Sequence, residues 1–250
     1  MRGQAVLVTG GAKRLGAVIA RRLAKDGARV VLHYGSSQGE AEALAREIGA
    51  AGVVQGDLAD GEGIDDLFAR ARDVAGGPIA GLVNSASAFE YDTPPKLDPV
   101  LLARLYAIGH SAPVLLASAL ARQDEVADGA VVNVLDQKVA NLNPDFFSYT
   151  GGKVALAGAT AMLAQALGPR IRINAVSPGI TLPSGDQSEA EFRKVASENV
   201  LQRPVDTADV AGAVAFLLEA RGLNGQVLYV DCGQRFLKRD RDVMFGHANG

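Results

Sequence analysis

The segment Thr9-Gly10-Gly11-Ala12-Lys13-Arg14-Leu15-Gly16 follows the apolar run Ala5–Thr9 and opens a stretch with helical periodicity at 15–25. Glycines between a strand and a helix let the backbone approach a pyrophosphate, and the helix N-terminus supplies amide donors. Two cations, Lys13 and Arg14, are unfavourable at a helix N-terminus by up to about 1 kcal/mol unless an anion binds there. A tight structural turn is the alternative; the position after a strand favours a phosphate site.

The rest of the chain alternates short β-branched runs with helical periods. Strands are expected at 5–9, 29–33, 53–54, 82–84, 130–135, 171–176 and 227–230, and helices at 15–25, 40–48, 64–74, within 99–123, 149–167 and 210–218. This alternation predicts an α/β fold: a Rossmann-type, doubly wound parallel sheet in three α/β/α layers. We expect one domain over 1–250, with a substrate loop at about 177–200 and a short helix after its irregular part, 177–186.

Composition narrows the function classes. The formal net charge of −3 does not favour nucleic acid or an anionic membrane as a partner. The single cysteine, Cys232, indicates a reducing, cytoplasmic location. A strand at 6–8 argues against a signal peptide, and the longest apolar stretches, such as 112–121, are too short to cross a bilayer. The three histidines and Cys232 lack ligand spacing, so no metal site is expected.

Polar and glycine residues gather where the expected strands end. Ligands of open α/β sheets bind at the carboxyl ends of the strands. The residues at these ends are 10–16, 33–37, Asp57, 84–89, Asp136 and 177–181. Their shared position predicts one ligand site at this edge of the sheet.

The end of the second strand, His33-Tyr34-Gly35-Ser36-Ser37, bears on cofactor choice. An NAD site places an acid here to bind the ribose 2′-hydroxyl. No acid occurs before Glu40, and Arg14 is expected nearby, so a 2′-phosphate fits and NADPH is predicted over NADH. An ordinary Gly-Ser turn is the alternative, and it would leave the choice open. Asp57 either accepts a hydrogen bond from the adenine amine or caps the next helix, a role that Asp60 could also fill.

Tyr149 and Lys153 are four residues apart on an expected helix and therefore share a face. A tyrosine with a pKa near 10 is a poor acid–base catalyst at neutral pH, and a nearby ammonium lowers that pKa. Gly151 and Gly152 between them weaken the helix, which indicates close packing against a ligand or a neighbouring helix. The spacing alone is a common coincidence; its place downstream of a cofactor turn makes the pair a catalytic candidate.

These residues together resemble the short-chain dehydrogenase/reductase family over almost the whole chain. The matching positions are Thr9-Gly10, Gly16, Asp57, Asn84-Ser85-Ala86, Tyr149, Lys153, Asn174, Pro178-Gly179 and Asp231. The motifs and the resemblance imply NADP(H) as cofactor. The expected contacts are Gly10, Lys13, Arg14, Leu15, Gly16, His33, Tyr34, Ser36, Ser37, Asp57, Leu58, Asn84, Ser85, Ala86, Tyr149, Lys153, Pro178, Gly179 and Ile180.

Within that family the chain is similar to the pteridine reductase branch. Four marks carry this likeness: Arg14 in place of the middle glycine, the His33 segment, Ser87 with Phe89 nearby, and Asp136 where most relatives have the catalytic serine. The resemblance implies catalytic residues Asp136, Tyr149 and Lys153. It implies substrate contacts from Arg14, Ser87, Phe89, Asp136 and Tyr149.

The chemical roles of Asp136 and Phe89 can also be inferred without the family resemblance. A carboxylate opposes the negative charge that develops when a ketone is reduced. It suits a C=N substrate that presents N–H donors, either as an acceptor or in a proton relay with Tyr149. The alternative is that Asp136 caps a loop outside the site. Phe89 is expected to stack on a flat heteroaromatic ring, with simple packing as the alternative.

Two features depart from the family pattern. Gly109 stands where many members have an asparagine that holds a relay water, so His110 or bound water would have to compensate. Cys232 replaces a usual glycine. The tail 235–250 has no assigned role.

The predicted function is NADPH-dependent reduction of a pterin, such as dihydrobiopterin or dihydromonapterin, or of dihydrofolate. A short-chain reductase of another carbonyl or imine substrate, and a non-catalytic NADPH-binding protein, are the alternatives. The family resemblance implies a homotetramer, with 101–120 and 149–167 as contact helices.

Overall fold

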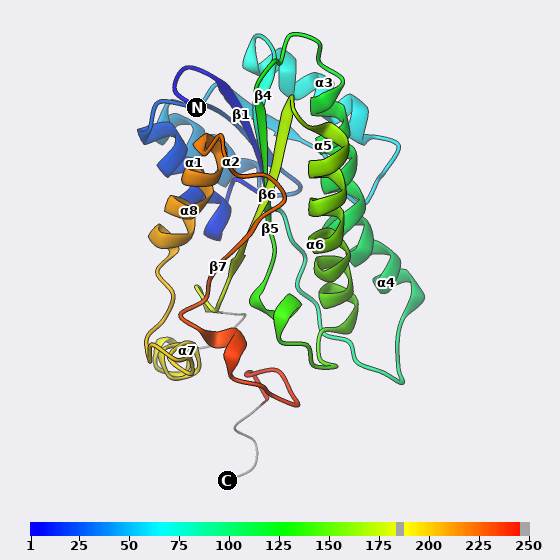
Figure 1. The fold of residues 1–250 in the computed structure, drawn as a ribbon, viewed down its shortest axis with the longest axis vertical. Helices are drawn as coiled ribbons and strands as arrows, with labels where there is room; N and C mark the ends of the chain where they lie inside the picture. Colours follow the sequence, from blue (N-terminus) through cyan, green and yellow to red (C-terminus); the bar gives the residue numbers. More distant parts are fainter. Residues whose placement is uncertain (184–187, 246–250) are drawn as a thin grey trace.

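The computed structural model describes residues 1–183 and 188–245. Its centre is a parallel sheet in the order β3-β2-β1-β4-β5-β6-β7 (Figure 1). The strands are β1 (Ala5–Thr9), β2 (Arg29–Tyr34), β3 (Gly52–Gln55), β4 (Ile79–Asn84), β5 (Gly129–Val134), β6 (Ile171–Pro178) and β7 (Val227–Val230). The predicted α/β class and parallel sheet are confirmed.

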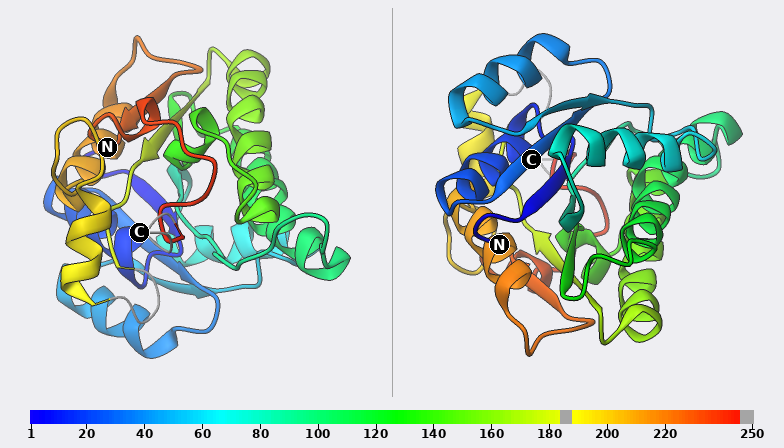
Figure 2. Two further views of the ribbon diagram at one scale, coloured as in Figure 1. Left: turned by 90° about the horizontal axis from the view of Figure 1, so that it is seen from below. Right: turned by 90° about the horizontal axis from the view of Figure 1, so that it is seen from above.

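Helices cover both faces of this sheet, which explains why β1, β4, β5 and β6 are buried along their whole length. One face carries α1 (Arg14–Lys25), α2 (Gln38–Ile48) and α8 (Thr207–Glu219) (Figures 1 and 2). The other carries α3 (Ile64–Ala75), α5 (Ala112–Ala121) and α6 (Phe147–Leu167). Each helix layer packs its apolar residues on its own face of the sheet, which gives the three layers expected.

A longer helix than expected runs along one side of the molecule. α4 (Pro99–Tyr106), a π-helical turn (Ala107–Ser111) and α5 join into one helical stretch, Pro99–Ala121. By length and composition alone this stretch could cross a membrane, so the expectation that no apolar segment is long enough was wrong. Core helices of soluble proteins meet the same criterion, and here α5 packs against β4, α3 and α6.

The strand order reverses direction between β1 and β4, and this switch point positions the site. Thr9 at the end of β1 pairs in register with Asn84 at the end of β4. The Thr9 hydroxyl accepts hydrogen bonds from the backbone N–H groups of Ser85 and Ala86, both at 3.1 Å. A single side chain thus shapes the crevice where ligands of doubly wound sheets bind.

The chain after β6 holds the expected short helix, α7 (Glu189–Ala196). A capping box formed by Ser188 and Glu191 fixes its start. Part of the expected substrate loop at 177–200, residues 184–187, lies outside the described residues, as do residues 246–250 of the tail.

Candidate active site

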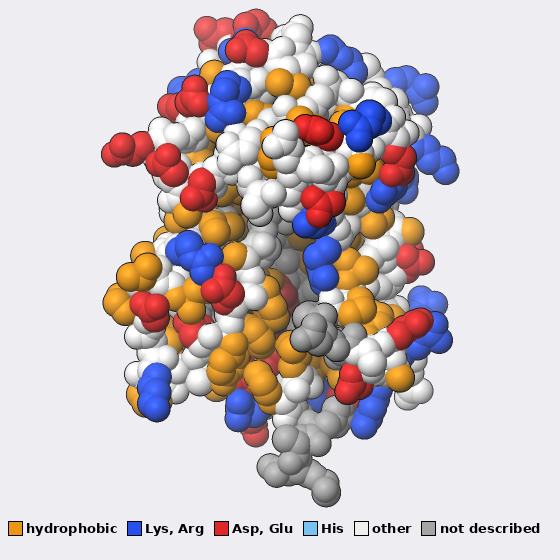
Figure 3. Space-filling model, turned by 180° about the vertical axis from the view of Figure 1, so that it is seen from behind, with side chains coloured by type: hydrophobic (Ala, Val, Ile, Leu, Met, Phe, Trp, Pro, Cys, Tyr) orange, Lys and Arg blue, Asp and Glu red, His pale blue; other side chains and the backbone are white. Residues whose placement is uncertain are grey.

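A cavity of about 590 Å³ lies at the carboxyl ends of the strands. Its wall includes the glycine-rich turn, the ends of β2, β4 and β5, the first turns of α6, the loop after β6 and part of the C-terminal segment. Figure 3 shows a face of the molecule that is hollowed near its centre, with hydrophobic side chains gathered below the hollow.

The glycine-rich turn is built for close backbone approach. A Cβ on Gly16 would lie 2.2 Å from the carbonyl oxygen of Gly10, and a Cβ on Gly10 would lie 2.7 Å from Cα of Ala86. α1 begins without a side-chain cap and has no acid in its first turn. The free amides at the start of α1 therefore fit the pyrophosphate of a dinucleotide.

The two cations of this turn have different partners. Lys13 Nζ lies 2.6 Å from a carboxylate oxygen of Glu40, and both side chains are about half exposed. Arg14 has a positive φ of 51° and donates to the carbonyl oxygen of Pro183 over 2.7 Å. Glu40 was not predicted as part of the site, but in the fold its carboxylate lies beside Lys13 and neutralises the charge of this lysine.

His33 supports the turn from behind and does not line the cavity. Its Nδ1 accepts from the N–H of Gly10 at 3.2 Å, and its Nε2 lies 3.1 Å from the carbonyl oxygen of Gly56. Burial lowers the pKa of His33 to about 4, so the ring is neutral. His33, which was expected to contact the cofactor, therefore holds the turn in place and does not face the cavity.

The other predicted cofactor contacts divide into two groups. Gly10, Lys13, Arg14, Leu15, Gly16, Tyr34, Ser37, Ser85, Ala86, Tyr149, Lys153, Pro178, Gly179 and Ile180 line the cavity. Ser36, Asp57, Leu58 and Asn84 do not. Asp57 Oδ1 accepts from the N–H of Ala59, Asp60 holds the chain just before α3, and Asn84 donates to the Asn133 side chain at 2.8 Å. These side chains shape the loops around the site.

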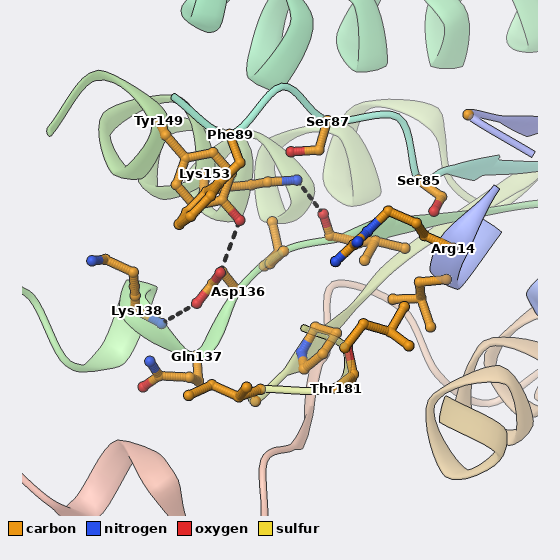
Figure 4. Close-up of a pocket in the computed structure, with 18 of the residues that line it drawn as sticks. Arg14, Ser85, Ser87, Phe89, Asp136, Gln137, Lys138, Tyr149, Lys153 and Thr181 are labelled. Atoms are coloured by element: carbon orange, nitrogen blue, oxygen red, sulfur yellow. Dashed lines mark hydrogen bonds between the residues drawn. The ribbon is translucent and has the colours of Figure 1, made fainter. Parts of the chain in front are cut away.

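Asp136, Tyr149 and Lys153 meet on the cavity wall (Figure 4). The Tyr149 hydroxyl donates to Asp136 Oδ2 at 2.8 Å. The Lys153 ammonium donates to the carbonyl oxygen of Val134 at 2.7 Å. That bond uses one of its three N–H groups, and among the described residues no other acceptor is recorded for it. Two donors therefore remain for a ligand such as a nicotinamide ribose.

Burial governs the protonation of these three groups. It raises the pKa of Asp136, and burial together with the Asp136 charge raises the pKa of Tyr149 well above 10. Burial lowers the pKa of Lys153 to about 8, against the opposing effect of Asp136. The expectation that Lys153 lowers the pKa of Tyr149 is not met in this geometry, because the phenol faces a carboxylate and Lys153 Nζ lies 5.8 Å from the ring centre. Tyr149 is held as a neutral phenol.

Asp136 combines the two roles that sequence reasoning kept apart. Its Oδ1 accepts from the N–H of Lys138 at 2.9 Å and so caps the short 3₁₀ helix Gln137–Ala140. Its Oδ2 accepts from Tyr149 inside the cavity. The cap fixes the carboxylate within the site.

Phe89 likewise packs and lines the cavity at once. Its ring stacks on Phe146 with centroids 4.0 Å apart and meets Tyr149 edge-on at 4.8 Å. It remains 43% exposed, and with Arg14, Ser87, Asp136 and Tyr149 it forms part of the cavity wall. Phe89 thus packs against its neighbours and also lines the cavity. All five residues predicted to contact substrate border the same cavity.

Gly109 lies in the π-helical turn Ala107–Ser111, where the helix meets α6. A Cβ on Gly109 would lie 3.6 Å from Cα of Gly152, and one on Gly152 would lie 3.4 Å from the carbonyl oxygen of Leu105. Close helix packing therefore explains Gly152, while Gly151 faces open space. His110 contacts Tyr106 and does not line the cavity, so the proposed compensation by this side chain is not borne out.

The described residues were also compared with the donor sets that bind metal ions. Among the residues that the structure describes, no group of three or more His, Cys, Asp or Glu side chains could hold a metal ion.

Known proteins match almost the whole chain. The family model described as Enoyl-(Acyl carrier protein) reductase matches residues 10–235. A protein of Picea abies named short-chain type dehydrogenase/reductase is 31% identical over 93% of this chain and 92% of its own length. The chain belongs to the short-chain dehydrogenase/reductase family. An uncharacterized oxidoreductase of Methylorubrum extorquens in the same family is 34% identical over 94% of this chain and 99% of its own.

A solved structure adds a cofactor to the comparison. FolM alternative dihydrofolate reductase 1 from Brucella canis, complexed with NADP, superposes with a TM-score of 0.90. It is 42% identical and covers 96% of this chain and 97% of its own. The short-chain dehydrogenase/reductase fold is thus shared over nearly the full length, with a nicotinamide cofactor present in the relative.

Sequence reasoning missed one wall of this short-chain dehydrogenase/reductase cavity. The missed residues are Gln137, Lys138, Gln234, Arg239, Arg241, Asp242, Val243 and Met244. Most belong to the tail, whose position cannot be inferred from local pattern. The available signal was Cys232, which adopts a positive φ of 51° where the family usually has glycine and so marks a turn into this segment.

Proposed function

We propose that this protein is an NADPH-dependent reductase of a pteridine, such as a dihydropterin or dihydrofolate. The observation that carries the proposal is the Asp136 carboxylate, which faces the Tyr149 hydroxyl at 2.8 Å in a cavity that Phe89 also lines. The 42% identity to a protein named alternative dihydrofolate reductase supports the same substrate class.

The proposed position of the cofactor is inferred from the glycine-rich turn. The uncapped amides of α1 and the turn around Gly10 and Gly16 would hold the pyrophosphate. Arg14, Tyr34 and Ser37 would surround the 2′-phosphate, and the free donors of Lys153 would hold the nicotinamide ribose. NADPH, when bound, supplies the hydride; the side chains position the substrate and move the proton.

The proton-handling residues fit a C=N bond better than a ketone. A ketone develops negative charge on oxygen, which an ionised Asp136 would oppose. A pteridine ring offers N–H and amino donors to that carboxylate and takes a proton on nitrogen. Tyr149, held neutral by its raised pKa, donates that proton, and Asp136 orients the phenol and passes a proton to it from solvent.

A second candidate function is reduction of another carbonyl or imine substrate. The Tyr149 and Lys153 pair supports it, because a phenol and an ammonium on the wall of one cavity can also serve a carbonyl substrate. The two candidate functions differ in the role of Asp136, which would bind the ring donors of a pteridine but would oppose the charge on a ketone oxygen. Substitution of this residue therefore distinguishes them.

Assembly into a homotetramer in the cytoplasm belongs to the same proposal. Exposed apolar side chains on α4 and α6 support an interface: Val100, Leu102, Tyr106, Phe147, Val154 and Met162. Light scattering coupled to size exclusion should give four times the mass of the chain, and a monomer would contradict the assembly.

The test of function is the loss of NADPH absorbance with purified protein and a substrate panel. The panel contains dihydrobiopterin, dihydromonapterin, dihydrofolate, an imine, an aldehyde and a ketone, each also assayed with NADH. We expect turnover of at least one dihydropterin or dihydrofolate and preference for NADPH. Turnover limited to the aldehyde or ketone would support the second candidate and remove the first.

A further inference from the structure

Lys138 is a buried cation directly beside the candidate catalytic residues. It is 3% exposed, and its ammonium donates to three acceptors: Asp242 Oδ2 at 2.7 Å, the Asp145 carbonyl oxygen at 3.1 Å and Asn143 Oδ1 at 3.2 Å. Asp242, also buried, comes from the C-terminal segment 104 residues away. A buried ion pair is tolerated when its remaining hydrogen bonds are made, and here all three donors are used.

The same residue holds the candidate proton-handling pair through its backbone. The N–H of Lys138 donates to Asp136 Oδ1, and Asp136 Oδ2 accepts from Tyr149. A shift of Lys138 therefore moves the cap that orients Asp136. Figure 4 shows the contact between Lys138 and Asp136. Through its side-chain bond to Asp242, the same residue connects the C-terminal segment to the reacting groups.

The C-terminal segment 239–245 has further anchors at this end of the sheet. The Asp145 carboxylate, which is fully buried, accepts from Nε of Arg241 at 2.7 Å and from the N–H of Asp242 at 2.8 Å. Phe245 stacks on Phe146, the ring that also stacks on Phe89. In Figure 1 this segment, drawn in red, lies across the lower end of the sheet.

The segment also contributes directly to the cavity wall. Arg239, Arg241, Asp242, Val243 and Met244 line the cavity together with Asp136 and Phe89. We propose that the C-terminal segment 239–245 is the outer wall of the substrate half of the site, and that Lys138 and Asp242 are positioning residues for Asp136. This inference rests on the proposed reductase activity.

The charges around the reacting groups predict a signature in the pH profile. The groups that face Asp136 and Tyr149 are Lys138, Lys153 and Asp242. Lys138 and Lys153 lower the pKa of Asp136, and Asp242 raises the pKa of Tyr149. Removing the Asp242 charge leaves Lys138 unopposed and should lower the pKa of Asp136, whereas removing both charges should raise it.

The first test compares Asp242→Asn with Asp240→Asn. Asp240 is exposed, lies two residues away and does not line the cavity, so it is a matched control for the loss of one charge. Asp242→Asn should raise the substrate KM about tenfold or more and move the Asp136 limb of kcat/KM to lower pH. NADPH affinity, measured by fluorescence titration, should stay within about twofold because the glycine-rich turn is untouched. Asp240→Asn should match the unmodified protein in all three.

A second variant covers the case in which Asp242→Asn does not fold. Lys138→Met with Asp242→Leu removes both charges and leaves no unpaired buried ion. Its Asp136 limb should move to higher pH, opposite to the single variant. A stability defect alone would not move these limbs in opposite directions.

The substrate in these assays is whichever member of the panel the unmodified protein reduces. Turnover of an aldehyde alone would remove the pteridine proposal and leave the comparison of variants intact. Turnover of no panel member would contradict the reductase activity and, with it, the role of the segment. Unchanged KM and coincident pH profiles in an active protein and both Asp242 variants would overturn the inference about the segment.

Discussion

The hydroxyl of Tyr149 donates to Oδ2 of Asp136 over 2.8 Å, with Tyr149 buried and Asp136 partly buried at the cavity wall. The phenol is therefore tied to a carboxylate, and Lys153 acts on it from further away. The proton of the pair resides on Tyr149, whose pKa is raised well above 10. Because a raised pKa makes the phenol a weaker acid, transfer of its proton to substrate requires Asp136, whose own pKa burial raises, to deliver a proton from solvent to the same oxygen. The predictions that follow depend on this coupling.

Tyr149→Phe should lower kcat by roughly 10²- to 10⁴-fold, because it removes the proposed proton donor. NADPH affinity should change little, since the ring and Lys153 remain. Steady-state assays and fluorescence titration measure the two effects. Tyr106→Phe, a tyrosine outside the cavity, is the control and should be fully active. A kcat within about tenfold of the unmodified protein would rule out the assigned role of Tyr149.

The pH dependence of kcat/KM should show a limb set by Lys153. Burial lowers the pKa of this ammonium to about 8, so it is charged below that pH and neutral above it. Activity should therefore fall as pH rises through about 8, because the donors that hold the nicotinamide ribose are weakened. Activity that stays constant well above pH 8 would contradict a requirement for the charged lysine.

Gly16→Ala should abolish NADPH binding or folding of the turn, because the new Cβ would lie 2.2 Å from the Gly10 carbonyl oxygen. Only a shift of the backbone could remove this clash, and that shift would displace the amides that are proposed to hold the pyrophosphate. Gly222→Ala is the control, since a Cβ there meets nothing within 4 Å. Fluorescence titration and thermal unfolding distinguish the two outcomes. Unaltered NADPH affinity in Gly16→Ala would exclude this turn as the cofactor site.

Glu40→Gln should increase NADPH affinity by about two- to fivefold, because it releases Lys13 from its 2.6 Å ion pair. The preference for NADPH over NADH should rise with it, and high salt should reduce the gain. Glu42→Gln, on the same helix without an ion pair to Lys13, is the matched control. If the two variants bind NADPH equally, Lys13 does not contribute to phosphate binding.

The stability of the protein should decrease as the pH is lowered, because His33 is buried as a neutral ring. The unfolded chain binds a proton at His33 near pH 6.5, whereas the folded state resists it until about pH 4. The contribution of this residue is thus complete above pH 6.5 and declines toward pH 4, by about 3 kcal/mol in all. Urea unfolding at several pH values should show this decline and a smaller one in His33→Asn. Equal pH dependence in both would contradict the neutral, buried ring.

The glycine-rich turn and the periodic strands were enough to predict the parallel sheet, because these signals are local. The cavity positions of Arg14, Phe89 and Asp136 were also predictable, since strand ends converge at one edge of such a sheet. The positions of Tyr149 and Lys153, on α6, followed from their spacing and from the family resemblance.

What could not be predicted depends on contacts between distant segments or on side-chain direction. The contact of Lys138 with Asp242 spans 104 residues, and no local pattern marks it. The His33 side chain lies in the interior, where both of its ring nitrogens are hydrogen-bonded to backbone groups. The pKa of Tyr149 is raised where a lowered one was expected, because its hydroxyl points to Asp136, a direction that spacing along a helix does not define.

The central claim is that Asp136 adapts a carbonyl-reducing Tyr149 and Lys153 pair to a pteridine. It is tested most directly by kcat/KM for a dihydropterin or dihydrofolate and for an aldehyde, in the unmodified protein and in Asp136→Ser. We predict that the unmodified protein prefers the pteridine and that Asp136→Ser lowers this preference by about 100-fold or more. An unchanged preference in Asp136→Ser, or an unmodified protein that reduces only the aldehyde, would contradict the claim.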